Sequence, residues 1–366
     1  MRTVVAYTAS PGLGGAEIAL GHLLAHASTA LDVLLVGTSQ QVVATLAARR
    51  PGMRAVVVPA SGARAAAAHL ALFRRLRPDV VHVNRHVPWA AALGIVAALA
   101  TPGARLVTVD QLPLRTVDPV ELWRTRALTL RADAAVAVGP ASARRIEDFY
   151  ALGRGSVHSV PNGVPDHGVR RRAARPSGPL VVGAVGRLDP MKGHDVLLRA
   201  LAQVDGVDVV LVGSGAEEGS LRGLARHLGI AGRVSFAGWL PSPPDFLPGF
   251  DVFALPSRSE GFPLALVEAM LAELPCVATP VGSIPAAITP ERTGLLVPTD
   301  DADALAAALR RLRDDPDLRD RLGAQARQAA LAAFTASTMT EAYERLWGRV
   351  AGRPRSALLR PPPPRP

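Results

Sequence analysis

Lysine occurs once in this chain, at position 192, in a segment whose residue types could bind an anion. The other 40 basic residues are arginines. The segment reads Gly186-Arg187-Leu188-Asp189-Pro190-Met191-Lys192-Gly193 and lies between an apolar run and a helical pattern. Arginine can bind two phosphate oxygens, lysine is a compact point charge, and a helix start favours negative charge. The segment therefore predicts a diphosphate site with Arg187 and Lys192 as its cations; chance placement of the lone lysine is the alternative.

Two carboxylates eight residues apart form the second candidate site. Glu260 precedes Gly261-Phe262-Pro263, and Glu268 follows in an apolar stretch. Proline suits a first helical position, so a helix beginning at Pro263 would carry Glu268 inside it. A carboxylate among apolar residues needs hydrogen-bond donors, and a ribose diol would supply them. The alternative is a solvated loop carboxylate followed by one on a helix surface.

Other reactive residue types give weaker signals. Cys276, the single cysteine, lies in an apolar stretch and is expected to be a core residue. His82 and His86 are one helical turn apart but have no third ligand in view, so no metal site is predicted.

The elements that must position these residues alternate regularly. Apolar β-type runs without polar alternation, separated by helical segments, indicate parallel sheets covered on both faces. The predicted strands are 3–7, 32–37, 55–59, 80–83, 105–109, 134–138, 180–185, 207–212, 233–237, 251–254, 275–278 and 294–297.

A Pro-, Gly- and Arg-rich break divides this pattern. We expect an N-terminal Rossmann-like domain over 1–167, a linker over 168–179 and a second Rossmann-like domain over 180–334. A helix over 335–350 would pack back toward the N-terminal domain, and a Pro/Arg-rich tail over 351–366 would be disordered. Two doubly wound α/β domains of this kind would face a cleft, with ligands at the carboxyl ends of the strands.

Composition narrows the class of protein. Hydrophobic residues make up 49% of the chain but aromatic residues only 4%. Basic residues number 18 against 10 acidic ones in residues 1–170, which suits an anionic substrate or a membrane surface. Scattered basic residues with few aromatics argue against nucleic acid. The longest apolar run, Val87 to Ala100, has about 14 residues, too few to span a bilayer, and is expected to be a buried helix. Since no signal-peptide pattern is present either, the expected location is the cytoplasm, with peripheral contact at the inner membrane face left open.

Taken together, the motifs resemble a known family. Gly-Arg-Leu-x-x-x-Lys-Gly at 186–193 and Glu-x7-Glu at 260–268 are similar to those of the retaining family 4 nucleotide-sugar glycosyltransferases with GT-B architecture. Weaker similarities are Gly14-Gly15-Ala16-Glu17, Pro161-Asn162-Gly163-Val164 and Val212-Gly213-Ser214-Gly215. In this order they cover nearly the whole chain.

The resemblance implies a role for each matched residue. Arg187 and Lys192 would hold the donor diphosphate, Glu268 the ribose, and Glu260 the transferred sugar. Donor-binding positions would also include Gly14, Gly15, Gly186, Gly213, Trp239, Gly261, Phe262, Pro263 and Leu264. The donor would be a UDP- or GDP-sugar, with no metal and no other cofactor, and the acceptor a lipid, polysaccharide or small metabolite.

Two departures from the family pattern concern the N-terminal domain. Asp110 and Asn84 stand where relatives often carry histidines. Asp110 is a candidate catalytic residue that could accept a hydrogen bond or act as a base, and it could equally be structural. The alternatives to transfer are a GT-B hydrolase or epimerase of nucleotide sugars and a degenerate nucleotide-sugar-binding partner subunit.

Overall fold

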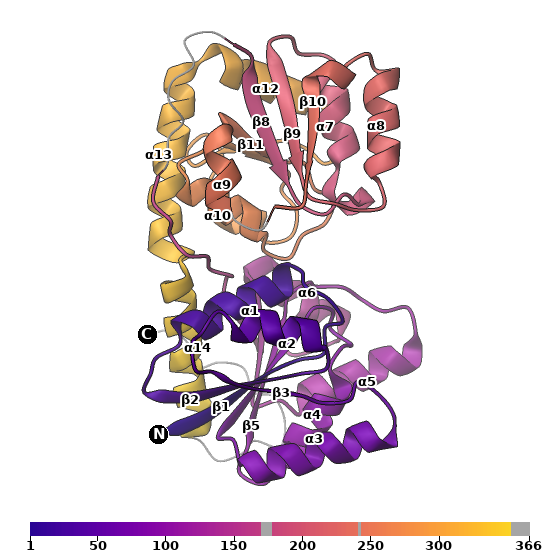
Figure 1. The fold of residues 1–366 in the computed structure, drawn as a ribbon, viewed down its shortest axis with the longest axis vertical. Helices are drawn as coiled ribbons and strands as arrows, with labels where there is room; N and C mark the ends of the chain where they lie inside the picture. Colours follow the sequence, from indigo (N-terminus) through magenta and orange to yellow (C-terminus); the bar gives the residue numbers. More distant parts are fainter. Residues whose placement is uncertain (170–177, 241–242, 353–366) are drawn as a thin grey trace. The chain divides into compact units, whose positions relative to one another are not determined.

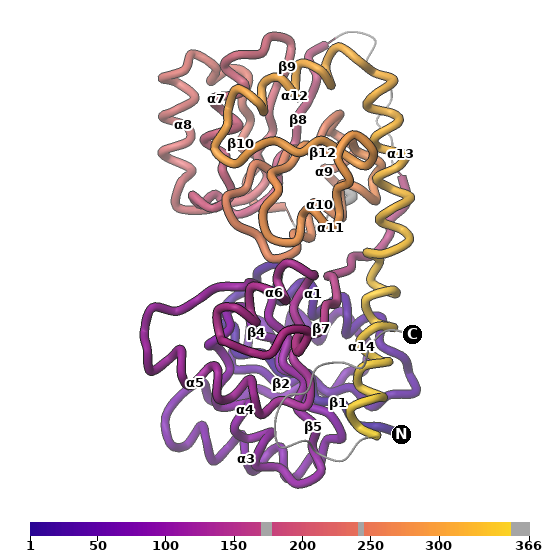
Figure 2. Tube along the Cα trace, turned by 180° about the vertical axis from the view of Figure 1, so that it is seen from behind, coloured from indigo at the N-terminus to yellow at the C-terminus, as the bar shows by residue number. Residues whose placement is uncertain are grey.

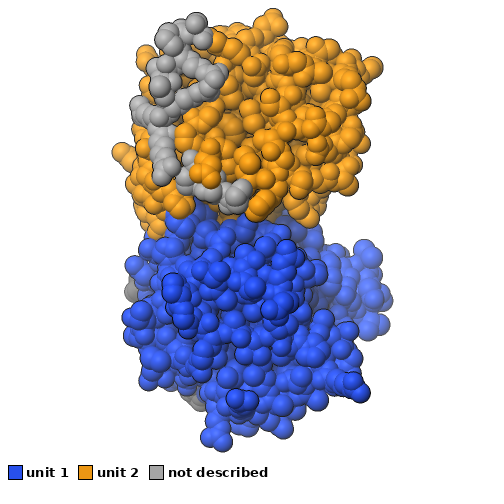
Figure 3. All heavy atoms as spheres, viewed as in Figure 1, with its two compact units in different colours: residues 1–165, 336–366 blue, residues 166–335 orange. Residues whose placement is uncertain are grey.

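The computed structural model describes residues 1–169, 178–240 and 243–352. The chain divides into two compact units, which Figure 3 colours separately. Unit 1 comprises residues 1–165 together with the segment from Ala336 onward, and unit 2 comprises residues 166–335. Most of the predicted linker (170–177) and of the predicted tail (353–366) lies outside the described residues.

Unit 1 is built on a parallel sheet (Figure 1). Among the described residues it has seven strands in the order β3-β2-β1-β4-β5-β6-β7. The strands are β1 (Arg2–Thr8), β2 (Leu31–Gly37), β3 (Arg54–Val57), β4 (Val80–Arg85), β5 (Arg105–Asp110), β6 (Ala134–Ala137) and β7 (Val157–Ser159). The helices are α1 (Gly15–His26), α2 (Gln40–Ala47), α3 (Ala63–Leu76), α4 (Ala92–Leu99), α5 (Pro119–Leu130), α6 (Pro140–Phe149) and α14 (Ala336–Ala351).

Helix α14, from the far end of the sequence, completes the core of unit 1. It packs with α1 against one face of the sheet, and Figure 2 shows it beside β1. Met339, Tyr343, Leu346 and Trp347 are buried in the cluster that also holds Val4. Burying side chains of this size contributes roughly 1.5–3 kcal/mol each, so α14 supplies a substantial part of this core.

Unit 2 repeats the design with a second parallel sheet. Its six described strands are ordered β10-β9-β8-β11-β12-β13. They are β8 (Leu180–Val185), β9 (Val207–Val212), β10 (Val234–Gly238), β11 (Val252–Leu255), β12 (Cys276–Ala278) and β13 (Leu295–Leu296). The helices are α7 (His194–Leu201), α8 (Glu218–His227), α9 (Pro243–Phe246), α10 (Leu264–Leu271), α11 (Ile284–Ala287), α12 (Ala302–Asp314) and α13 (Pro316–Ala333), with 3₁₀ turns η1 (Pro190–Lys192), η2 (Ala231–Arg233) and η3 (Leu247–Gly249).

Each sheet reverses its strand order at one point. In unit 1 the chain winds from β1 toward β3 and then restarts on the other side at β4; in unit 2 the same reversal separates β8 from β11. The crevice beyond the carboxyl ends of such neighbouring strands is where open α/β sheets bind ligands. The prediction of two doubly wound α/β domains is thus confirmed, whereas the predicted cleft between them stays a prediction.

Two local predictions were wrong. The apolar run from Val87 to Ala100 was expected to be one buried helix, but α4 occupies only Ala92–Leu99, because Ala91 before it adopts a left-handed conformation (φ 66°) that ends the helix there. The helix of the Glu-x7-Glu segment was expected to begin at Pro263, which instead is the extended N-cap residue (φ −74°, ψ 119°), so α10 begins at Leu264.

Candidate functional site

The structure brings Lys192 and Glu260 into contact at the strand-order reversal of unit 2. Lys192 ends the turn after β8, and Glu260 lies in the loop after β11. The ammonium Nζ is 2.6 Å from Glu260 Oε1, and the two side chains are 18% and 8% exposed. An ion pair so little exposed is poorly screened by solvent, so each charge fixes the position of the other.

Glycine makes this contact possible, because the two loops touch through their main chains. Gly193 adopts a left-handed conformation (φ 66°) between η1 and α7. A Cβ at this position would lie 2.0 Å from the carbonyl oxygen of Pro256 in the loop after β11. A larger residue at 193 would therefore push the Lys192 loop away from the Glu260 loop.

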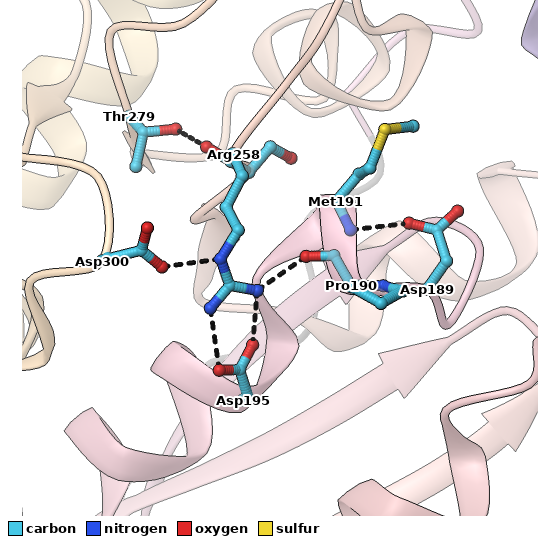
Figure 4. Close-up of polar contacts among 8 residues, drawn as sticks. Asp189, Pro190, Met191, Asp195, Arg258, Thr279 and Asp300 are labelled. Atoms are coloured by element: carbon cyan, nitrogen blue, oxygen red, sulfur yellow. Dashed lines mark hydrogen bonds and ion pairs between the residues drawn. The ribbon is translucent and has the colours of Figure 1, made fainter.

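Hydroxyl groups hold Glu260 from its other side. Ser257 Oγ, fully buried, donates a 2.7 Å hydrogen bond to the same Oε1 atom that meets Lys192. The carbonyl oxygen of Ser257 in turn accepts a hydrogen bond from Thr279 Oγ1, at the end of β12 (Figure 4). Ser257 and Thr279 were missed from the sequence, although Ser257 stands three residues before Glu260 in the same motif.

Arg187 is close in sequence to Lys192 but is oriented differently. Its guanidinium forms an ion pair with Asp189 at 2.9 Å, and its side chain is 70% exposed. Gly186 lies under the lysine, since a Cβ there would be 3.3 Å from Lys192 Cε. In the described structure Lys192 is thus the buried cation of this loop and Arg187 the accessible one.

Gly213 supports the same loop from β9. It has φ 139°, and a Cβ would lie 1.9 Å from the carbonyl oxygen of Gly186. Its N–H donates to Gly238 O, at 2.7 Å, at the end of β10. Trp239 follows directly and is 67% exposed. The segment after β10 therefore presents a free indole face at the same edge of the sheet as Lys192.

The residues after Glu260 are largely buried. Phe262 packs on Phe334 with ring centroids 5.1 Å apart, and Leu264 begins α10 as a buried residue. The Gly261 carbonyl accepts a hydrogen bond from Ser283 N at 2.9 Å. Glu268 lies in the second turn of α10 and is half-buried. The side chains of Phe262 and Leu264 are therefore packing groups, which leaves their main chain as the part of this segment that could meet a ligand.

His194 is a neighbour of Lys192 that the sequence did not single out. It opens α7 and is buried. Burial, reinforced by the Lys192 charge, lowers the pKa of His194 to about 4. The ring is therefore neutral at pH 7 and adds no charge to the site.

In unit 1 the glycine loop lies at the corresponding reversal of strand order. Gly14 caps α1, and the Glu17 carboxylate accepts a hydrogen bond from its N–H at 3.1 Å. A Cβ on Gly15 would meet no atom within 4 Å. Burial raises the pKa of Glu17, although hydrogen bonds from Ser10 and the backbone oppose this. The loop leaves open space beside the main chain of Gly15.

A chain of amides joins this loop to the other strand ends of unit 1. Asn84 Nδ2 donates to Ala16 O at 3.1 Å, Gln111 Nε2 donates to Asn84 Oδ1 at 2.8 Å, and Asn162 Nδ2 donates to Gln111 Oε1 at 2.9 Å. Asn84 is therefore bound within unit 1. Gln111 was missed because an isolated glutamine carries no sequence signal.

Asp110 is deeply buried. Its Oδ2 is 2.6 Å from Arg85 Nη2, and the side chains are 0% and 1% exposed. Arg85 also donates to Pro88 O and Thr129 Oγ1. Burial raises the pKa of Asp110, while Arg85 lowers it. This enclosed ion pair is what the structural alternative for Asp110 predicts.

The two histidines of the N-terminal domain do not form a metal site. Trp347 Nε1 donates to His82 Nδ1 at 3.3 Å, and Tyr343 packs edge-on against the same ring. Burial lowers the pKa of His82 to about 3 and also lowers that of His86. No group of three or more His, Cys, Asp or Glu side chains suited to a metal occurs in the described part of the chain. Cys276 is buried in β12, in the core role expected for it.

None of the helices described here has the length and apolarity that crossing a membrane requires.

Each of the two units matches a glycosyltransferase family model. The model for "Glycosyltransferase Family 4" matches residues 13–167 and that for "Glycosyl transferases group 1" matches residues 168–329. The chain is 36% identical over 174 residues to the lipopolysaccharide core biosynthesis glycosyltransferase LpsD of Rhizobium meliloti, covering 48% of this chain and 51% of that protein. It is 31% identical over 289 residues to the D-inositol 3-phosphate glycosyltransferase of Streptomyces avermitilis, covering 69% and 61%.

The chain thus spans about half the length of the first of these relatives. In structure it is similar to Anabaena Alr3699/HepE, solved in complex with UDP, with a TM-score of 0.83 and 21% identity over 95% of this chain and 100% of that one. The fold is that of the GT-B glycosyltransferases, with two Rossmann-like domains. The two adjoining family matches agree with the motifs at Lys192 and Glu260, and the chain belongs to the family 4 glycosyltransferases.

Proposed function

We propose that this protein transfers a sugar from a nucleotide-diphosphate sugar to an acceptor hydroxyl, with retention of anomeric configuration and without a divalent metal. The observation that carries the proposal is the Lys192–Glu260 pair, which lies at the carboxyl ends of β8 and β11. An ammonium has three N–H groups, and one of them meets Glu260. The other two are available for the oxygens of a diphosphate.

The remaining donor contacts are assigned from the same loops. Arg187, whose side chain is 70% exposed, would turn from Asp189 and bind the diphosphate. Glu268 would bind the ribose. Glu260 and the main chain from Gly261 to Leu264 would both contact the transferred sugar. Gly213 and Trp239 would border the base. In unit 1, Gly14 and Gly15 would be the donor-binding positions. Asp110 would act as a positioning residue through Arg85 rather than as a reacting group.

The proposed step breaks the bond between the anomeric carbon and the leaving phosphate oxygen. A bond from the acceptor oxygen forms on the same face of the sugar, and the acceptor proton passes to the leaving diphosphate. Negative charge thus develops on the diphosphate, where Lys192 and Arg187 stabilise it. Removing one preorganised donor of this kind costs about 10²–10³-fold in turnover.

The donor and acceptor follow from the relatives by analogy. UDP is the ligand named for the Anabaena protein, so UDP-sugars come first among candidate donors and GDP-sugars second. The names of two relatives refer to lipopolysaccharide core biosynthesis and to D-inositol 3-phosphate. A glycolipid, a polysaccharide or a small polyol phosphate would therefore be offered as acceptor, and unit 1 would bind it.

The test is turnover of a donor panel with matched variants. Lys192→Ala and Glu260→Ala should each lower turnover at least tenfold, because each removes one member of the pair. Lys192→Arg should have an effect of the same size, because arginine cannot place a point charge in the space beside Gly186. Arg199→Ala, an exposed residue of α7, is the control. NMR of the product anomer and full activity in EDTA test retention and metal independence. Equal rates for wild type and all three site variants would refute the assignment.

One alternative is a subunit that binds a nucleotide sugar without turning it over. The enclosed Arg85–Asp110 pair favours it, because a side chain that is 0% exposed cannot contact a ligand. Calorimetry would then show donor binding with no product alongside any acceptor. A hydrolase or epimerase would instead consume the donor in the absence of acceptor. Product analysis with and without acceptor separates the three.

The proposed location is the cytoplasm, with peripheral contact at the inner membrane face through α5. Val117, Val120 and Trp123 are 100%, 73% and 70% exposed, and the buried side of α5 carries Thr125 and Thr129. Leu122, Leu128 and Leu130 of α5 pack inward, whereas Val120 and Trp123, with Val117 just before the helix, face outward. The exposed arginines nearby are Arg115, Arg124, Arg126 and Arg131. Trp and Arg together suit an anionic lipid interface.

Sedimentation with anionic and with zwitterionic vesicles tests this contact. Wild type and Trp239→Ser, which removes an equally exposed indole of unit 2, should bind anionic vesicles. Trp123→Ser should lose most of that binding. Equal binding by the two variants would contradict a role for α5.

A further inference from the structure

Arg258 joins the two loops that carry the Lys192–Glu260 pair. It lies two residues before Glu260, and its guanidinium reaches across to the segment around Lys192 (Figure 4). Nη1 and Nη2 each contact one oxygen of Asp195 at 2.8 Å. Nη1 also donates to Pro190 O at 2.6 Å, and Nε to Asp300 Oδ1 at 2.6 Å.

The main chain of Arg258 makes the same connection. Its N–H donates to Met191 O at 2.7 Å, next to Lys192 in sequence. Contacts from Arg258 therefore reach positions 190, 191 and 195, which bracket Lys192 on both sides. Any movement of the loop after β11 must move Glu260 and these contacts together.

Arg258 is poorly suited to bind the donor itself. Four of the five guanidinium N–H groups are used by protein oxygens. One positive charge faces the two carboxylates of Asp195 and Asp300, so its surroundings carry net negative charge. Burial raises the pKa of Asp195, but the hydrogen bonds and charge of Arg258 outweigh this and hold it below the usual value. A phosphate would be repelled here.

We infer that Arg258 is a positioning residue, which fixes the separation of Lys192 and Glu260 and so aims the ammonium at the leaving group. The inference rests on the proposed function for its catalytic consequence. Its structural content is independent of that function, because it concerns how one side chain sets the environment of another. The bidentate contact with Asp195 needs a planar fork, so lysine at 258 would not replace it.

Turnover provides the first test. Arg258→Gln and Arg258→Lys should lower kcat about 10–100-fold with KM changed less than about threefold, because small displacements of a reacting group have effects of this order. Arg311→Gln is the matched control, since it removes another bidentate arginine–carboxylate pair, with Glu291, in the same unit. It should leave kcat within about twofold of wild type.

A double variant separates positioning from general destabilisation. If Arg258 acts through Lys192, then Arg258→Gln should lower kcat by less than about threefold in a Lys192→Ala background. A merely structural role would cause the same loss in both backgrounds. Equal fold-losses in the two backgrounds would overturn the inference.

The lone lysine allows a readout that needs no turnover. Protein labelled with [¹³Cε]lysine, free of tags containing lysine, gives one side-chain resonance, from Lys192. In Arg258→Gln this resonance should move toward its position in Glu260→Gln, where the ammonium has lost its partner, and Arg311→Gln should leave it unchanged. An unmoved resonance in folded Arg258→Gln refutes the inference. If Arg258→Gln does not fold, Asp300→Ala, which removes only the acceptor of the Nε contact, takes its place. A wild type inactive with every donor would instead count against the proposed function alone.

Discussion

The Lys192–Glu260 pair should show a large coupling energy, which a double-mutant cycle can measure. Breaking a buried pair by removing one partner costs about 3–5 kcal/mol, whereas exposed pairs are worth less than about 1 kcal/mol. The side chains here are 18% and 8% exposed, so the pair lies nearer the buried limit. Lys192→Met leaves the Glu260 carboxylate with the hydroxyl of Ser257 as its side-chain donor, and we expect the free energy of unfolding to fall by about 2.5 kcal/mol.

The other corners of the cycle follow from exposure. Glu260→Gln should lower the free energy of unfolding by about 1 kcal/mol, because the ammonium that it leaves can reach water. The double variant removes both charges and loses only hydrogen bonds, so its expected loss is about 1.5 kcal/mol. The resulting coupling energy is about 2 kcal/mol, well above the roughly 0.5 kcal/mol scatter of independent sites.

Scanning calorimetry of the intact chain is the assay. The unfolding transition of unit 2 is assigned with Leu197→Ala, which should lower the Tm of that unit alone because Leu197 is fully buried in its core. Lys192→Met should lower its Tm by about 5–10 °C, at 2–4 °C per kcal/mol for a unit of this size. Additive shifts, with coupling below about 0.5 kcal/mol, would refute the reasoning that the pair is sheltered from solvent.

Three further predictions concern other parts of the chain. His82 should make unit 1 about 2 kcal/mol less stable at pH 5 than at pH 7.5. Its pKa is lowered to about 3 by burial, so it stays neutral in the folded protein, whereas in the unfolded chain it binds a proton near pH 6.5. Urea unfolding of His82→Phe at the two pH values should show a correspondingly smaller difference. Gly213→Ala, whose Cβ would overlap Gly186 O, should lower the Tm of unit 2 and weaken donor binding, whereas Gly219→Ala, with open space around it, should do neither. Because burial raises the pKa of Cys276, a thiol reagent should label it only as the protein unfolds, and rapid labelling of the native protein would contradict its burial.

The architecture could be predicted because its signals are local. Apolar runs without alternation identify buried parallel strands, and all twelve predicted strands overlap strands of the structure. Strand β7, Val157–Ser159, was missed because its three residues include a histidine and a serine. Lys192 and Glu260 could be expected to meet, since both follow parallel strands of one sheet and so lie at the same edge.

The partners of individual charges could not be predicted in the same way. Asp195 and Arg258 are 63 residues apart in a chain with 40 arginines, and no spacing rule selects that pair. Asp110 is similar: it looked available in the sequence, but Arg85 at the end of β4 encloses it. Such contacts depend on strand order and loop path, which the sequence pattern leaves open.

The placement of α14 has a consequence for how the protein is made. Unit 1 includes residues 1–165 and the segment from Ala336, so a ribosome must synthesise all of unit 2 before the first unit receives Tyr343 and Trp347. The nascent N-terminal sheet is exposed on its α14 face during that interval, whereas unit 2 is contiguous and can complete its fold first. Truncation before Ala336 should therefore leave a soluble, folded unit 2 attached to an N-terminal segment that chaperones retain.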